Sequence, residues 1–186
     1  MQFNGIAEGV LSDRQISKMI NDGHISSEQA IESRQIQPAS LDLRLGKKAY
    51  RLRASFLPGK AAKVSERLNE FTMHEMDLCS GAVLEKGCVY VVPLLEALDL
   101  PSEISGAASA KSSIGRLDLL TRVITDDGVE FDRVPSGYTG PLFVEICPRS
   151  FSVLVRFGHM LTQIIFRLGQ TILTDKARFD LQRQTP

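Results

Sequence analysis

The sequence has no tryptophan, only three cysteines and only three histidines. The cysteines, Cys79, Cys88 and Cys147, are odd in number and far apart, which excludes a C-x-x-C zinc spacing and an even disulfide framework. We expect them to be buried thiols. His74 begins no H-E-x-x-H motif, because Leu78 occupies the place of the second histidine. The sequence therefore predicts no zinc site and no other metal site on the protein.

An excess of either charge is also absent, since 22 basic residues balance 22 acidic ones. No apolar run approaches the roughly 20 residues that a membrane-spanning helix needs. The first ten residues contain Glu8 and lack a basic leader followed by a hydrophobic stretch, so we expect no secretory signal. Without a broad field of one sign, attraction to a nucleic acid polymer or an anionic membrane is not expected. A cytoplasmic location is the default prediction.

The composition fits one domain over residues 1–186, because 43% hydrophobic residues in a chain of this length can bury a working core. A helix is predicted at about 12–22, where Ser12 and Gln15 have the spacing of a capping box. An apolar stripe at helical spacing follows these two residues. A tail at about 170–186 completes the predicted domain.

Short strands separated by glycine and proline account for most of the remaining chain. The predicted strands cover residues 41–45, 88–92, 105–109, 153–156 and 163–166, and Pro93 is expected to close the second of them. A weaker helical pattern has its apolar residues at Val64, Leu68 and Phe71. This organisation predicts a mainly β fold, a sandwich or barrel with one or two peripheral helices.

Glu145 is the most informative single residue. It lies in the strand-like run 142–146 and shares a strand face with Phe143 and Cys147, because side chains alternate between the two faces of a strand. A carboxylate on a partly apolar face is costly unless it is paired, protonated or used. Glu145 is therefore a candidate general base. The alternative is a solvated strand residue on a face open to water.

A second informative stretch runs from residue 110 to residue 116. Ser112 or Ser113 is a good N-cap for a short helix, and the backbone N–H groups of such a start attract phosphate oxygens. Lys111 and Arg116 add positive charge, and an arginine can bind an anion through two hydrogen bonds. The stretch predicts a phosphate-binding turn, with an ordinary polar surface turn as the alternative.

The third stretch, residues 128–140, is rich in glycine and reads as a shaped loop. Asp132 could accept a hydrogen bond from a sugar hydroxyl, and Tyr138 could present its flat face to a sugar or a base. Because Glu145 follows after one short strand, the loop and the acid are expected to meet in one cleft. The alternative is a plain hairpin with its tyrosine packed on the surface.

Taken together and in this order, these stretches resemble the dCTP deaminase branch of the dUTPase superfamily. The resemblance extends from Leu11 to about Gly169. Five segments carry it: Gln37–Gly46, Lys111–Arg116, Asp132–Gly140, Phe143–Ile146 and Gly158–Gln163. Each segment alone is a weak signal, whereas five in the family's order are a strong one.

The resemblance implies a distorted β-barrel of jelly-roll type, usually a homotrimer with active sites at subunit boundaries. It implies an enzyme of pyrimidine deoxyribonucleotide metabolism that hydrolyses dCTP to dUTP and ammonia. In this branch water adds to C4 of cytosine without zinc. Mg²⁺ is expected to arrive on the triphosphate rather than in a protein cage.

By position in the family's motifs, Glu145 would be the proton shuttle. Ser112 would help to hold the water, and Arg116 would orient Glu145 or bind phosphate. The other implied substrate contacts are Lys111 and Ser113 to the triphosphate, Asp132 to the 3′-hydroxyl, Tyr138 to the sugar or base, and Gln163 as a nearby support.

The chain departs from the family at three places. Lys111 replaces the usual arginine, the segment 122–140 is longer than in short bacterial enzymes, and the end lacks the family's tail rich in Tyr, Lys and Gln. It looks most like the N-terminal half of the longer, tandem form. Two alternatives stay open: a dUTP diphosphatase, in which Asp132 activates water, and a non-catalytic nucleotide-binding domain, in which Glu145 pairs with Arg116.

Overall fold

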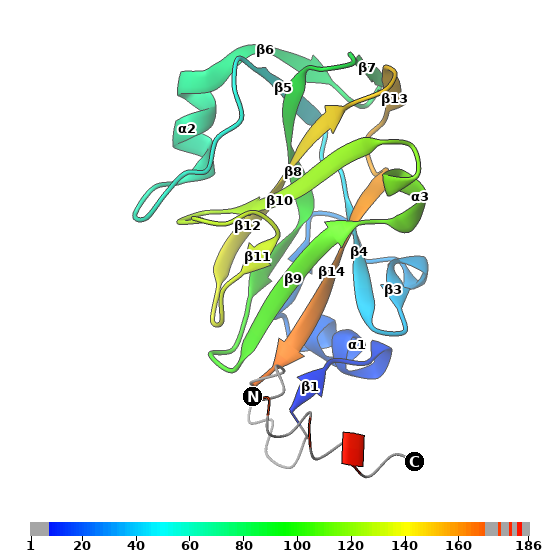
Figure 1. Cartoon of the computed structure of the whole chain (residues 1–186), viewed down its shortest axis with the longest axis vertical. Coiled ribbons are helices and arrows are strands. Elements are labelled where there is room, and N and C mark those ends of the chain that lie inside the picture. The colour runs from blue at the N-terminus through cyan, green and yellow to red at the C-terminus, as the bar shows by residue number, and fades with distance from the viewer. Residues whose placement is uncertain (1–7, 170–174, 176–178, 180–181, 184–186) are drawn as a thin grey trace.

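The computed structural model describes residues 8–169, 175, 179 and 182–183. Strands dominate this part of the chain and form two facing sheets, with helices at the periphery (Figure 1). The predicted tail at about 170–186 lies almost entirely outside the described residues. The cysteines differ from expectation: all three are free, but Cys147 is buried, Cys88 is partly buried, and Cys79 is exposed in the turn after Asp77.

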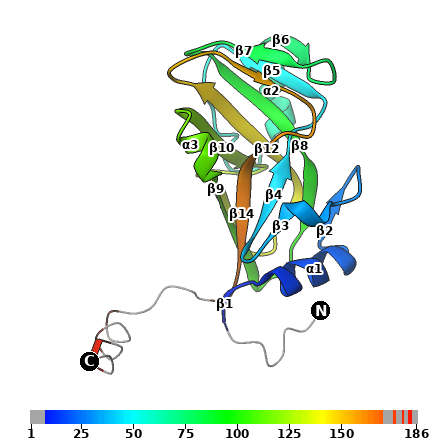
Figure 2. The ribbon, with the colours of Figure 1, turned by 90° about the vertical axis from the view of Figure 1, so that its right-hand side faces the viewer.

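The first sheet has six strands. In spatial order they are β11 (Arg133–Val134), β9 (Ile104–Ala110), β14 (Met160–Leu168), β4 (Ser40–Arg44) and β3 (Ile36–Gln37), and β1 (Gly9–Val10) also pairs with β14. Figure 2 shows β14 and β4 side by side in this sheet.

The second sheet also has six strands. Their order is β10 (Leu119–Thr125), β12 (Thr139–Pro148), β8 (Val89–Asp99), β5 (Lys48–Leu52) and β6 (Thr72–Asp77), and β2 (Ile25–Ser27) pairs with the far end of β8. A separate two-stranded sheet joins β7 (Ala82–Leu84) to β13 (Val153–Val155).

The inward faces of the two large sheets share one hydrophobic core. Leu41, Ile164 and Phe166 come from the first sheet, and Val144 and Ile146 come from the second, each with 0% of its surface exposed. Alternation along the strands explains this packing, because every second side chain points to the same side. The prediction of a mainly β, jelly-roll-like fold is confirmed. In the described part of the chain the strands form facing sheets and do not close into one barrel.

Both predicted helices are present. The first, α1 (Asp13–Asn21), begins where the Ser12 N–H donates to Gln15 Oε1 at 2.8 Å. The second, α2 (Val64–Phe71), lies over the outer face of the second sheet. A third, α3 (Ser112–Gly115), is a single turn, and a 3-10 turn, η1, covers Ser33–Gln35. None of the helices in the described residues is long and apolar enough to cross a lipid bilayer.

The expectation that Pro93 ends its strand is wrong, because β8 continues to Asp99. Pro93 lies opposite Phe143, where the pairing of β8 with β12 shifts register. Its carbonyl accepts the Gly46 N–H at 2.8 Å, and the N–H that proline lacks is not needed at such an irregularity. The extra length of β8 carries Glu96 into the interior beside β4.

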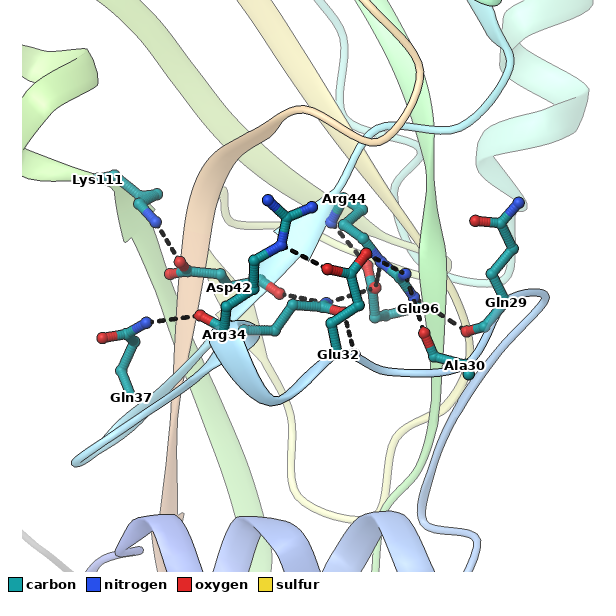
Figure 3. Close-up of polar contacts among 10 residues, drawn as sticks. Gln29, Ala30, Glu32, Arg34, Gln37, Asp42, Arg44, Glu96 and Lys111 are labelled. Atoms are coloured by element: carbon teal, nitrogen blue, oxygen red, sulfur yellow. Dashed lines mark hydrogen bonds and ion pairs between the residues drawn. The ribbon is translucent and has the colours of Figure 1, made fainter.

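Glu96 forms a buried ion pair with Arg44, and both residues are at most 2% exposed. The Arg44 Nε lies 2.8 Å from Glu96 Oε1, and the Arg44 backbone N–H donates to Glu96 Oε2 at 2.8 Å. The Gln35 side chain donates to Glu96 Oε1 at 2.9 Å. Figure 3 shows this network between β4 and β8. Both carboxylate oxygens of Glu96 are therefore satisfied, as a buried charge requires.

The rest of the Arg44 guanidinium holds the segment 27–37 against the outer face of β4. It donates to the carbonyls of Ala30 and Gln29 at 3.1 and 3.0 Å and to Ser27 Oγ at 2.9 Å. The Gln35 side chain of this segment also donates to the Asp42 carbonyl at 2.9 Å, and Asp42 is buried. The network thus fixes one wall of the region around Asp42.

Replacing Glu96 with alanine leaves the buried Arg44 with only the half-exposed carboxylate of Glu32, 3.8 Å from its Nη1, as counter-charge. We expect Glu96→Ala to lower the free energy of unfolding by about 3–5 kcal/mol in urea titrations followed by circular dichroism. The matched control is Glu75→Ala, which removes an exposed partner of Lys48 and should have little effect. Equal stability of the two variants would contradict a structural role for the network.

Candidate active site

The position of Glu145 follows from the register of β12 between β8 and β10. Its pairing partner on β8 is Val91, and its partner on β10 is Arg122. It shares the outer face of the sheet with Phe143, where α2 and the segment before it pack. Only 1% of Glu145 is exposed. The alternative of a solvated strand residue is therefore excluded.

Arg122 supplies the counter-charge for Glu145. Its Nε lies 3.1 Å from Glu145 Oε1, and its Nη2 donates to the same oxygen. The other oxygen, Oε2, is buried and has no hydrogen-bond partner among the described residues. An unpaired buried acceptor is costly and therefore marks a candidate functional atom.

The guanidinium of Arg122 is itself held on two further sides. It stacks over the ring of Phe131, with 3.7 Å between Cζ and the ring centroid, and its Nη2 donates to Ser55 Oγ at 3.2 Å. Nothing in the sequence pattern singles out Arg122, because its pairing with Glu145 depends on strand register. Arg116, which the family resemblance makes a candidate partner of Glu145, is exposed after α3 and forms no ion pair with the described residues.

Asp132 is anchored beside this pair. Its Oδ1 accepts the Val123 N–H at 2.7 Å, and its own N–H donates to the Val123 carbonyl at 2.8 Å. Burial raises the pKa of Asp132 above its usual value, and the Val123 N–H and the nearby Arg122 charge only partly oppose that shift. Arg122 and Val123 therefore link the loop to the strand opposite Glu145, but Glu145 does not line the pocket that contains Asp132, and a shared cleft stays a prediction. Contact of Asp132 with a sugar hydroxyl stays a prediction.

Tyr138 has a different position from the predicted one. It is 7% exposed and belongs to the main core. Its hydroxyl donates to the Pro141 carbonyl at 2.6 Å and accepts the Asp126 N–H at 3.1 Å. A ring that is 7% exposed presents no open face to a sugar or base on this chain. We therefore correct the assignment of Tyr138 from substrate contact to structural support of the loop.

A second group of predicted residues lines one pocket of about 290 Å³. The lining residues are Gln37, Asp42, Lys111, Ser112, Ser113 and Gln163. They come from three separate stretches of the chain, so only the fold brings them together. The pocket thus brings together four of the predicted site residues, Lys111, Ser112, Ser113 and Gln163.

Lys111 and Asp42 form an ion pair at the wall of this pocket, and Figure 3 shows the lysine reaching toward β4. Asp42 is 1% exposed, and its Oδ1 has no partner among the described residues. A neighbouring pocket of about 420 Å³ shares Lys111 and Ser113 and adds Arg34 and His159. This concentration of cationic and titratable groups suits an anionic ligand.

The turn at Ser112 is a weaker anion-binding helix terminus than the sequence predicts. Lys111, not a serine, occupies the N-cap of α3, and the helix has only four residues. A dipole of one turn is small, so the hydroxyl groups and the lysine charge are the stronger anion-binding features. Ser112, Ser113 and Arg116 are exposed on this chain. Glu145 is not among the residues that line either pocket.

The described residues contain no group of three or more His, Cys, Asp or Glu side chains that could hold a metal ion.

Comparison with known proteins identifies relatives of this chain. The family described as "2'-deoxycytidine 5'-triphosphate deaminase (DCD) N-terminal domain" matches residues 7–170. A crystal structure of 2'-deoxycytidine 5'-triphosphate deaminase from Agrobacterium tumefaciens has a TM-score of 0.89 and 50% sequence identity. That match covers 97% of this chain and 54% of the other chain.

Two curated relatives are both named "dCTP deaminase, dUMP-forming". The protein of Corynebacterium glutamicum (strain R) is 34% identical over 115 residues, which are 60% of this chain and 58% of the relative. The protein of Methanoculleus marisnigri is 30% identical over 164 residues, which are 84% of this chain and 79% of the relative. The chain therefore spans little more than half the length of the Agrobacterium and Corynebacterium proteins.

The structural role of Tyr138 can be tested by replacing it with phenylalanine. Tyr138→Phe leaves the Asp126 N–H and the Pro141 carbonyl without their partner, and we expect the free energy of unfolding to fall by about 1–3 kcal/mol. Burial raises the pKa of Tyr138 to about 12, so its hydroxyl stays protonated in the folded protein. The decrease in the free energy of unfolding caused by Tyr138→Phe should therefore be the same at any pH below the ordinary tyrosine pKa of about 10. Unchanged stability in urea titrations would contradict this role.

Proposed function

The chain belongs to the family of 2'-deoxycytidine 5'-triphosphate deaminase N-terminal domains, and from this premise we propose that it hydrolyses dCTP to dUTP and ammonia. The proposal goes beyond family membership, because the chain covers only part of several relatives. Its main support is the state of Glu145, a buried carboxylate with one oxygen held by a cation and the other unpaired.

Glu145 has the chemistry that this reaction needs. Deamination requires a base that takes a proton from water as its oxygen attacks C4 of cytosine. The same group delivers that proton to the ring nitrogen, then takes the second proton from the new C4 hydroxyl and passes it to the amine, so that ammonia leaves and a carbonyl remains. An unpaired acceptor oxygen such as Oε2 can take part in both transfers. The oxygen atom of the water becomes the new carbonyl oxygen, which balances the atoms of the reaction.

The pocket around Lys111 is the proposed place for the triphosphate. Lys111 and Ser113 would contact the phosphates, with Gln163 as support, while Ser112 would help to hold the water. Asp132 would accept a hydrogen bond from the 3′-hydroxyl. Mg²⁺ would enter bound to the phosphate oxygens of the substrate, where it would neutralise their charge.

An oligomer belongs to the proposal, with a trimer as the favoured state. Glu145 does not line the pockets that contain Ser112 and Lys111. In a trimer with sites at the subunit boundaries, Ser112 and Arg116 of one copy would approach Glu145 of another copy. Arg116 would then bind phosphate or orient Glu145 across the boundary.

The names of two relatives favour a second candidate, in which the product is dUMP. Formation of dUMP needs hydrolysis between the α- and β-phosphates after deamination, with release of pyrophosphate. Asp132 is the carboxylate in the loop from which a water at the α-phosphate could be activated.

The catalytic role of Glu145 can be tested with purified protein, Mg²⁺ and dCTP. We expect ammonia release by the unsubstituted chain and a fall of about 10²–10⁴-fold in kcat for Glu145→Gln, because the amide cannot accept the proton. Glu75→Gln, on an exposed strand position, is the matched control and should keep full activity.

The same reactions distinguish the candidate functions. Ammonia without pyrophosphate supports deamination to dUTP, and both products in equal amounts support the route to dUMP. Pyrophosphate from dUTP without ammonia from dCTP would show a diphosphatase instead. Nucleotide binding without either product would show a regulatory domain.

A further inference from the structure

We infer that Arg122 is the positioning residue of Glu145, an inference that rests on the proposed deamination. Arg122 lies directly opposite Glu145 in the pairing of β10 with β12. A pair in direct register brings the two side chains together on one face of the sheet. No other cation forms an ion pair with Glu145 in the described residues.

The hydrogen bonds from Arg122 to the Glu145 carboxylate are arranged asymmetrically. Both the Nε and the Nη2 of Arg122 donate to Oε1 of Glu145, and neither donates to Oε2. A guanidinium that used both oxygens would occupy the whole carboxylate. Here two donors fix the direction of one oxygen and leave the other without a hydrogen-bond partner among the described residues. The arrangement therefore orients the carboxylate without blocking the atom that would exchange protons.

Arg122 is also rigid enough to act in this way. Its guanidinium is fixed by the ring of Phe131 at 3.7 Å and by Ser55 Oγ at 3.2 Å, in addition to Glu145. A planar guanidinium can stack and donate from several N–H groups at once, whereas a lysine ammonium provides only a mobile point charge. Its side chain is 30% exposed, whereas that of Glu145 is 2% exposed, so the arginine forms the outer side of the pair.

The charge of Arg122 has a second consequence. A carboxylate that is 1% exposed is strongly disfavoured in its ionised form unless a cation compensates it. General base catalysis needs the ionised form before water attacks. Arg122 therefore supplies the counter-charge that this buried carboxylate needs and also directs its unpaired oxygen.

The test compares steady-state kinetics of Arg122→Gln, Arg122→Lys and Phe131→Leu in the full chain. We expect kcat for dCTP to fall about 10–100-fold in Arg122→Gln, as for a misplaced catalytic group, with KM changed less than about threefold. Arg122→Lys retains the positive charge but not the planar geometry of the guanidinium. Its kcat should therefore lie between those of Arg122→Gln and the unsubstituted chain. Phe131→Leu, which removes the stacking but keeps an apolar side chain against the second hydrophobic cluster, should reduce kcat by a smaller factor.

Two controls separate positioning from simple stabilisation. Arg53→Gln removes another arginine that stacks on a phenylalanine, Phe71, but does not contact Glu145. It should lower thermal stability without lowering kcat. In Arg122→Ala, added methylguanidinium should restore part of kcat, because it can occupy the vacated site. Restoration would not be expected for a residue that only stabilises the fold.

The possible results distinguish a failure of the inference about Arg122 from a failure of the proposed deamination. If the unsubstituted chain releases no ammonia from dCTP, the proposed function and this inference both fail. If that chain is active and a folded Arg122→Gln variant keeps its kcat, the inference alone fails. A fall in kcat that matches the loss of folded protein, without restoration by methylguanidinium, also overturns it.

Discussion

The burial of the Glu145 carboxylate is the constraint on which the rest of the candidate site depends. An ionised group at this depth needs a compensating cation, and the β10–β12 register places Arg122 opposite it. A register change of one residue would turn Glu145 to the opposite face, into the core between the sheets. The pairing of two neighbouring strands thus decides whether the carboxylate is a usable base or an unsatisfied charge.

A second buried carboxylate follows the same pattern. Asp42 gives one oxygen to Lys111 and keeps the other unpaired, as Glu145 does with Arg122. The saturated Arg44–Glu96 network lies next to Asp42, but there every carboxylate oxygen has a partner. Full satisfaction is typical of a structural network, whereas a free buried oxygen suits a group that exchanges ligands or protons. By this difference Asp42 and Glu145, unlike Glu96, are candidates for functional groups.

Several local features could be read from residues alone, because local chemistry determines them. The capping spacing of Ser12 and Gln15 predicts α1, and alternation around Glu145 predicts a strand with the acid on a partly apolar face. Two predictions failed where distant partners decide the outcome. Pro93 remains inside β8 because the opposing strand is irregular there, and Tyr138 is buried because two backbone groups satisfy its hydroxyl.

The amino-acid order alone determined the mainly β architecture, the phosphate-binding candidates Lys111 to Ser113 and the choice of Glu145, since these depend on periodicity and on neighbours in the chain. Only the tertiary structure decided that Arg122 is the partner of Glu145 and that Lys111 is the partner of Asp42. Those pairs join residues 23 and 69 positions apart. Cross-strand register and the packing of separate segments create such contacts, and neither leaves a periodic signal in the sequence.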